Sequence, residues 1–146
     1  MEKIITQLLA ITLKDAEEIT ALSTQLGYEN KMENLLDRAQ EILKSKNDCV
    51  FVAKLDGKIV GWIHGFRAVR IESPLFVEIA GLVVDHQRQK QNIGKGLIEA
   101  VREWSISLGI KKIRVRCNII RTESHKFYEN VGFSQNKQQK IFEIEI

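Results

Sequence analysis

Residues 82–97 read LVVDHQRQKQNIGKGL, and the rest of the chain is organised around this stretch. Its apolar beginning, which ends at Val84, has the character of a strand, and the next eight residues are polar. From Ile93 onward apolar residues recur at the spacing of a helix. The pattern therefore predicts a strand, a loop and the start of a helix, with Gly94 and Gly96 at the junction.

The glycine pair predicts a site for an anion. Glycine has no Cβ, so backbone N–H groups near Gly94 and Gly96 could approach a ligand where a helix N-terminus offers unpaired donors and the positive end of its dipole. A helix that merely starts at a small-residue turn would carry the same pair. Two familiar motifs are excluded, because no Gly-x-x-x-x-Gly-Lys-Ser/Thr occurs and Glu99 stands where Gly-x-Gly-x-x-Gly needs its third glycine.

What remains is Gln89-x-x-Asn92-x-Gly94-x-Gly96 directly after an apolar strand. It resembles the acetyl-coenzyme A pyrophosphate loop of the GNAT superfamily of N-acetyltransferases, whose pattern is Gln/Arg-x-x-Gly-x-Gly/Ala. Asn92 departs from this pattern, since the family usually has glycine there. Asparagine tolerates a positive φ better than most residues, so we expect the loop to form.

A second resemblance lies downstream, where residues 118–133 read NIIRTESHKFYENVGF. The family signature is commonly Asn-x-x-x-x-x-Ala-x-x-Phe-Tyr-x-x-x-Gly-Phe, and only Ser124 differs from it. One predicted helix and one predicted strand separate the two motifs, as in the family. The resemblance is strong over residues 76–133 and covers the N-terminal third only in outline.

Local signals predict the elements before the loop. Residues 4–9 read as a strand, and a helix capped by Thr12 is expected to stop at a left-handed Gly27. A second helix is expected over residues 32–44. Asp56-Gly57 supplies the positive φ angles of a two-residue turn and predicts a hairpin of residues 49–55 with 58–69. The nearly apolar run 76–84 predicts an interior strand.

After the loop, the pattern predicts a helix over residues 94–108 and a strand over 112–118 that runs parallel to the strand at 76–84. A short helix at 124–130, capped by Gly132, is expected before a final hairpin of residues 133–135 with 141–146. The expected fold class is α/β, with a central mixed, mostly antiparallel sheet, helices on both faces and one domain over residues 1–146. The resemblance implies that the parallel strand pair is splayed.

Composition bounds the function. The 146 residues are 44% hydrophobic and 28% charged with a net charge of +3, which is typical of a globular domain. Basic and acidic residues are mixed, no apolar run is long enough to span a membrane, and no secretory cleavage site follows Met1. We expect a cytoplasmic protein with neither a nucleic-acid nor a membrane partner. Cys49 and Cys117 lack metal-type spacing and are interpreted as buried thiols, so no metal is expected.

The resemblance implies how acetyl-coenzyme A would bind as acyl donor. Its pantetheine arm would pair with the backbone of residues 82–84, and its pyrophosphate would sit on amides of the following loop and helix start. Asn118 would make a polar contact to the pantetheine or adenylate side, directly or through water, and Phe127 of the same motif would be a core residue. The predicted cofactor-binding residues are Leu82, Val83, Val84, Gln89, Lys90, Gln91, Asn92, Ile93, Gly94, Lys95, Gly96, Asn118, Arg121 and Phe127.

Acetyl transfer to an amine needs a neutral nitrogen and a proton for the leaving thiolate. Glu78 lies eleven residues before Gln89, the offset of the catalytic glutamate in histone-type family members, and is the candidate base. A carboxylate facing solvent or paired with arginine is its alternative. The resemblance points the hydroxyl of Tyr128 at the cofactor sulfur as general acid, and a packed aromatic ring is the alternative there.

The predicted function is transfer of acetyl from acetyl-coenzyme A to a primary amine by direct attack in a ternary complex. A small-molecule amine is preferred as acceptor, and a protein N-terminus or lysine is the runner-up. The family builds its acceptor site from the segments that correspond here to residues 28–32 and 67–75, which carry mixed charge. A non-catalytic acyl-coenzyme A sensor stays open as another class, and a homodimer is a possible assembly.

Overall fold

The computed structural model describes residues 2–88 and 91–146. The chain divides into two compact units, Met1–Arg116 and Cys117–Ile146. The first unit carries a sheet and three α-helices, and the second carries one α-helix.

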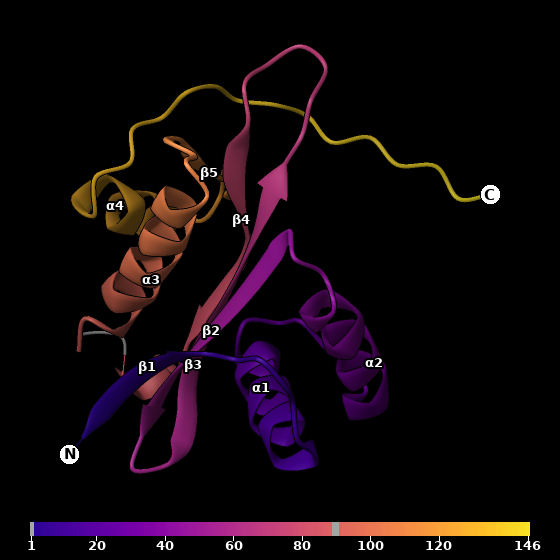
Figure 1. Cartoon of the computed structure of the whole chain (residues 1–146), viewed down its shortest axis with the longest axis vertical. Coiled ribbons are helices and arrows are strands. Elements are labelled where there is room, and N and C mark those ends of the chain that lie inside the picture. The colour runs from indigo at the N-terminus through magenta and orange to yellow at the C-terminus, as the bar shows by residue number, and fades with distance from the viewer. Residues whose placement is uncertain (1, 89–90) are drawn as a thin grey trace. The chain divides into compact units, whose positions relative to one another are not determined.

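A five-stranded mixed sheet forms the centre of the first unit (Figure 1). Its strands lie side by side in chain order, and all neighbours are antiparallel except the last two, which are parallel. This arrangement confirms the predicted fold class. The strands are β1 (Lys3–Gln7), β2 (Asp48–Leu55), β3 (Lys58–Ala68), β4 (Phe76–Val84) and β5 (Ile113–Val115).

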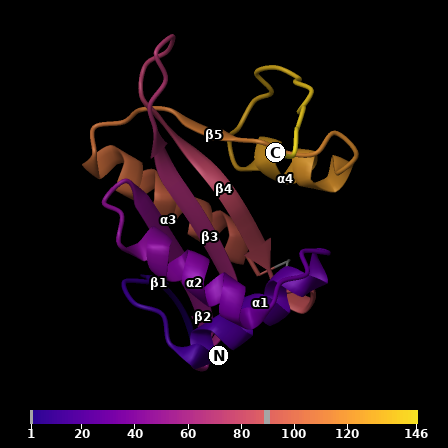
Figure 2. The same cartoon turned by 90° about the vertical axis from the view of Figure 1, so that its right-hand side faces the viewer.

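Helices cover both faces of this sheet (Figures 1 and 2). Helices α1 (Leu13–Gln25) and α2 (Met32–Leu43) lie on one face, and α3 (Ile93–Ser107) lies on the other. A short 3-10 helix, His86–Arg88, follows β4. The core on the α1 and α2 face is built from the buried residues Leu8, Ile19, Leu22, Val50, Val52, Ile59 and Val83.

The predicted start and stop signals are confirmed by the backbone. Thr12 caps α1, because its hydroxyl accepts from Asp15 N at 3.1 Å while the Asp15 carboxylate accepts from Thr12 N at 3.0 Å. Gly27 ends this helix with a φ of 83°. The hairpin turns at Asp56 and Gly57, whose φ angles are 50° and 82°. A two-residue turn of this kind requires a positive φ at both positions.

Two glycines of β3 let α3 lie close to the sheet. A Cβ on Gly61 would come within 3.1 Å of Ile93, and one on Gly65 within 3.2 Å of Val101. Register shifts of β3 also fall beside both glycines, so close packing and irregular strand pairing occur together.

In the second unit, α4 (Thr122–Asn130) is followed by Gly132 at a φ of 108°, as predicted. The predicted final hairpin is wrong, because residues 133–146 form neither helix nor strand. Phe142 and Ile144 are 88% and 86% exposed. Alternating apolar and acidic side chains favour a strand, but an isolated two-stranded hairpin has too little apolar surface to bury to be stable.

The predicted strand over 112–118 is shortened to β5, which ends at Val115. In the described part of the chain, no helix has the length and hydropathy that a membrane crossing requires.

Candidate functional site

The loop before α3 ends in a left-handed residue. Asn92 is the N-cap of α3, with φ 59° and ψ 20°, and its side chain makes no capping hydrogen bond. Asn92 therefore has a positive φ, which asparagine tolerates better than most residues. The first amide bonded within the helix is that of Gly96, which donates to Asn92 O at 3.0 Å. The N–H groups of residues 93–95 are therefore outside the hydrogen bonding of the helix itself.

The electrostatics of this helix start suit an anion. The first turn of α3 carries no acidic residue, and the exposed Lys95 lies within it. Lys3 of β1 adds a second cation, since its Nζ lies 3.5 Å from Gln91 O. Amide donors, the helix dipole and the Lys3 ammonium group thus lie close together, and Lys95 is in the same helical turn.

Packing against β1 explains the glycine at position 96. A Cβ at this position would collide with the end of the Ile5 side chain on β1. The glycine therefore allows α3 to pack against the edge strand, which differs from the expectation that it opens backbone to a ligand. Gly94 is buried in the first turn. Of the remaining predicted loop residues, Gln91 is exposed, whereas Gln89 and Lys90 lie outside the described residues.

The parallel pairing of β4 with β5 covers only the first part of β4. Their parallel register joins Val77 to Ile113 and Ile79 to Val115, and no further pair follows in the described residues. The register of β4 with β3 shifts at the same point, from Gly65–Ile79 to His64–Gly81, so Ala80 is an extra residue in β4. Residues 80–84 thus lack a β5 partner, which confirms the splayed pair.

The predicted pantetheine strand presents two kinds of side chain. Val83 is 2% exposed and belongs to the core beneath α1, so only its backbone could meet a ligand. Leu82 and Val84 are half-buried. A strand whose backbone has no neighbour on one side can pair with an extended ligand, as a peptide pairs with a sheet edge.

Glu78 is paired with an arginine. Its Oε1 accepts a hydrogen bond from Arg116 Nε at 3.2 Å, and the two side chains are 12% and 50% exposed. Arg114 is engaged nearby, because its guanidinium carbon lies 4.2 Å from the centre of the Phe76 ring. The arginine-paired alternative for Glu78 is therefore the arrangement found.

An aspartate–histidine pair lies on the same sheet face as Glu78. His64 Nε2 and Asp48 Oδ1 are 2.7 Å apart, with side chains that are 17% and 21% exposed. Phe66 links the two sites, because it stands opposite Glu78 in the register and its ring centre is 6.1 Å from that of His64. The sequence did not reveal this pair, although an aspartate at a strand start and a histidine across the predicted hairpin were its visible signals.

The remaining predicted residues belong to the second unit. Asn118 organises the turn before α4, since its backbone oxygen accepts from Arg121 N at 3.0 Å and lies 3.0 Å from His125 Nε2. Tyr128 stands between Phe127 and Phe133, with ring centres 5.2 and 5.7 Å away in edge-on contacts. The tyrosine ring is thus held by aromatic packing within its own unit.

The two cysteines are free thiols. Cys49 is 2% exposed, and burial raises the pKa of its thiol to about 12. Cys117 is partly exposed. Among the residues described, no group of three or more His, Cys, Asp or Glu side chains is arranged to hold a metal.

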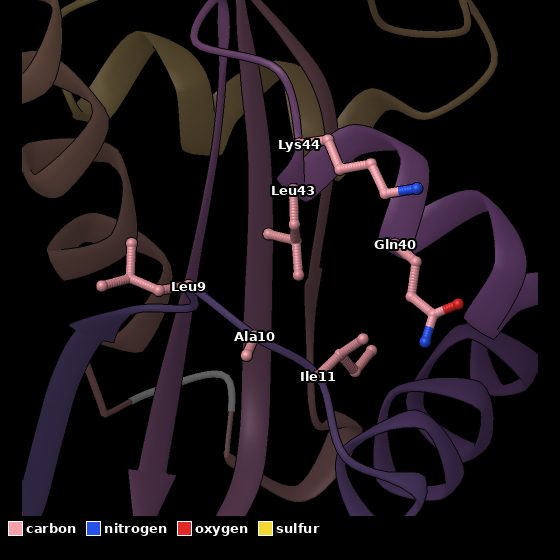
Figure 3. Close-up of a pocket in the computed structure, with 6 residues that line it drawn as sticks. All are labelled: Leu9, Ala10, Ile11, Gln40, Leu43 and Lys44. Carbon is pink, nitrogen blue, oxygen red and sulfur yellow. The ribbon is translucent and has the colours of Figure 1, made fainter.

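A separate open pocket of about 440 Å³ lies between α2 and the connection from β1 to α1 (Figure 3). None of the residues predicted to bind or react lines it. The lining residues are Leu9, Ala10, Ile11, Gln40, Leu43 and Lys44.

Comparison with known protein families identifies the family of this chain. The model of the "Acetyltransferase (GNAT) family" matches residues 13–133, which are most of the chain. The chain belongs to the GNAT acetyltransferase family. This confirms the resemblance stated from the two motifs.

The curated relatives match about three quarters of the chain or less. The probable N-acetyltransferase camello of Xenopus laevis is 29% identical over 112 residues, which are 75% of this chain and 50% of that protein. The N-acetylaspartate synthetase of Homo sapiens is 28% identical over 100 residues, which are 68% of this chain and 32% of that protein. This chain therefore spans half of the first of these relatives and about a third of the second.

Solved structures confirm the GNAT fold along the full chain. Aminoglycoside acetyltransferase AAC(6')-Iy, in complex with the bisubstrate analogue CoA-S-monomethyl-acetylneamine, has a TM-score of 0.85 at 21% identity, with 100% of both chains covered. Aminoglycoside 6'-N-acetyltransferase AAC(6')-Ih from Acinetobacter baumannii has a TM-score of 0.85 at 14% identity, with 99% of both chains covered. At these identities the likeness concerns the fold alone.

Proposed function

We propose that this GNAT chain is an acetyl-coenzyme A-dependent N-acetyltransferase that acetylates a primary amine of a small molecule by direct attack in a ternary complex. The observation that carries the proposal is the left-handed Asn92, which starts α3 beside the half of β4 that β5 leaves unpaired. An anion site and an open strand are thereby neighbours in one unit, as an extended donor with a pyrophosphate requires.

In this proposal the donor lies along β4 and ends at α3. The pantetheine amides pair with backbone groups of residues 82–84, where no β5 residue competes in the described chain. The pyrophosphate accepts from the N–H groups of Ile93, Gly94 and Lys95, which the helix does not use. Gln89, Lys90, Gln91 and Gly96 flank it, and Asn118, Arg121 and Phe127 keep the roles that the second motif implies.

In the proposed reaction, Glu78 acts on the acceptor amine and Tyr128 acts on the leaving thiolate. Glu78 draws the acceptor's ammonium group toward the donor and assists its loss of a proton, directly or through water. As the amine nitrogen bonds to the acetyl carbon, the carbon–sulfur bond breaks and its electron pair passes to sulfur. Tyr128 donates its proton, or a hydrogen bond, to the thiolate that forms. The Phe-Tyr-x-x-x-Gly-Phe motif supports this role.

Small-molecule amines are the preferred acceptors for two reasons. The Homo sapiens relative is an N-acetylaspartate synthetase, and the structural neighbours include aminoglycoside acetyltransferases. The sheet face beside Glu78 also holds compact, paired charges, Asp48 with His64 and Glu78 with Arg116, which suit a small polar amine. A protein N-terminus or lysine is the second candidate.

Thiol release from acetyl-coenzyme A tests the function and the acceptor class together. The chain is incubated with matched panels of small primary amines and of peptides that carry a free N-terminus or lysine, and products are identified by mass spectrometry. We expect amine-dependent thiol release and a product heavier by one acetyl group with small amines. Acetyl-coenzyme A binding without turnover on either panel would favour the sensor, and turnover confined to peptides would favour the second acceptor class.

A further inference from the structure

We propose that His64, oriented by Asp48, receives the second proton of the acceptor, the one that the amine nitrogen loses as it bonds to the acetyl carbon. The inference rests on the proposed acetyl transfer and extends it to a residue pair on β2 and β3. The 2.7 Å contact between His64 Nε2 and Asp48 Oδ1 is charge-assisted when the carboxylate is ionised.

The contact fixes the chemistry of the imidazole. Asp48 is an acceptor when ionised, so the neutral ring donates from Nε2 and keeps the lone pair of Nδ1 for another proton. Asp48 is the hydrogen-bond partner of this ring in the described part of the chain. A neutral histidine with one fixed nitrogen and one available nitrogen is the arrangement of a general base.

The position of His64 suits the reacting end of the site. It stands opposite Gly81 in the register, directly beside the extra residue Ala80, where β4 and β5 begin to separate. Trp62 closes the next position of the same face, because a Cβ on Gly81 would lie 2.8 Å from its ring. With 17% of its side chain exposed, His64 is sheltered but reachable.

The charges around His64 separate its role from that of Glu78. Glu78 already accepts a hydrogen bond from Arg116, so its charge is shared with a guanidinium. Asp48 has the imidazole as its partner. The helices over this face, α1 and α2, contribute apolar side chains to the core there. Asp48 is therefore the carboxylate in contact with the imidazole, and its charge stabilises the imidazolium once it forms.

Glu78, directly or through water, first takes one proton from the acceptor's ammonium group, which leaves a neutral amine. The amine nitrogen bonds to the acetyl carbon and passes a proton to His64 Nδ1, while the carbon–sulfur electron pair goes to sulfur. Tyr128 supplies the proton that makes the free thiol. Glu78 holds the amine in place, Glu78 and the imidazolium then release their protons to water, and Tyr128 recovers a proton from water. Asp48 is a positioning residue, because it acts through His64.

The test uses an amine on which the parent turns over. His64→Gln should lower kcat by on the order of 10²-fold, leave the Kd for acetyl-coenzyme A unchanged and flatten the acid limb of the kcat/KM profile. His86→Gln, which changes an exposed histidine of the 3-10 helix, is the matched control and should behave as the parent. His64→Ala should regain rate when imidazole is added.

Asp48 is tested by coupling. Asp48→Ala should lower kcat in the parent but cost little in the His64→Gln background, whereas a merely structural role would give additive losses. A His64→Gln enzyme with the parental kcat and pH profile would overturn the inference and leave the proposed function intact. Binding of acetyl-coenzyme A without turnover on any amine would overturn both.

Discussion

Arg116 Nε donates a hydrogen bond to Glu78 Oε1 at 3.2 Å across the parallel strands β4 and β5. The contact holds a carboxylate that is 12% exposed in the middle of the paired region, one residue before the last pair of β4 with β5. Glu78 is thereby fixed in direction, and its negative charge is only partly available to a bound ammonium group.

Glu78→Gln should leave the affinity for acetyl-coenzyme A intact and lower kcat/KM for the amine by at least 10-fold. The neutral isostere keeps the packing but loses the attraction for the ammonium group, so the loss should be largest below the pKa of the acceptor. Steady-state kinetics over pH measure it. An unchanged pH–rate profile with a strongly basic acceptor would remove Glu78 from the mechanism.

Asn92→Gly should be tolerated, with a change in the free energy of unfolding within about 1 kcal/mol, because glycine adopts a φ of 59° without strain. Asn92→Val should cost more, about 1–3 kcal/mol, since a β-branched residue is strained there. Urea unfolding measures both variants. If the glycine variant clearly lost affinity for acetyl-coenzyme A, the Asn92 side chain would be a ligand to the donor.

Tyr128→Phe should lower turnover by on the order of 10²-fold with little change in stability or in the Kd for the donor. The substitution removes one oxygen and keeps the ring that packs against Phe127 and Phe133. Single-turnover kinetics, in which product release does not limit the rate, are the appropriate measurement. Parental turnover in that experiment would leave Tyr128 as a packing residue.

Because of Cys49, we expect the free energy of unfolding to fall at alkaline pH. Burial raises the pKa of its thiol to about 12, so the unfolded chain loses this proton first as the pH rises. The stabilisation is complete below pH ~9 and falls as the pH rises toward 12, by about 1.4 kcal/mol at pH 10. Denaturant unfolding from pH 8 to 10.5 should show this slope in the parent and a flatter one in Cys49→Ala. Equal slopes would contradict the assignment.

Local signals predicted most of the fold because each has a backbone cause. Thr12 and Gly27 bound α1 through a capping box and a left-handed turn, and Asp56-Gly57 closes the hairpin with two positive φ angles. The prediction for residues 133–146 was wrong for a different reason. Alternation indicates which side chains share a face of a strand, but it does not supply the neighbouring strand with which that strand would pair.

The Asp48–His64 pair could not be predicted, because it depends on a register shift. From the turn at Leu55 and Lys58, a regular hairpin would place His64 opposite Cys49 and leave Asp48 on the other face. The register instead shifts after Lys54–Ile59, so that Ala53 pairs with Gly61. This puts His64 opposite Val50, and hence on the face of Asp48. One extra residue in β3 thus creates the pair.

The sequence did not show which arginine pairs with Glu78. Arginines at 114 and 116 alternate as on one face of a strand, but the alternation does not identify the group that each arginine faces. In the parallel register Glu78 stands beside Arg114, yet Arg114 covers the Phe76 ring and Arg116 reaches the carboxylate. Only the register decides which residues of the two strands stand beside each other.

The most direct test of the central claim, that the N-terminus of α3 holds the pyrophosphate of acetyl-coenzyme A, is calorimetric titration of the donor into the parent and Gly94→Val. Glu103→Val, a β-branched substitution at an exposed position farther along the same helix, is the matched control. Thermal melting of each protein without ligand confirms that it is folded. The account predicts binding to the parent and the control, and loss of binding in Gly94→Val. A folded Gly94→Val protein that binds acetyl-coenzyme A as tightly as the parent would contradict it.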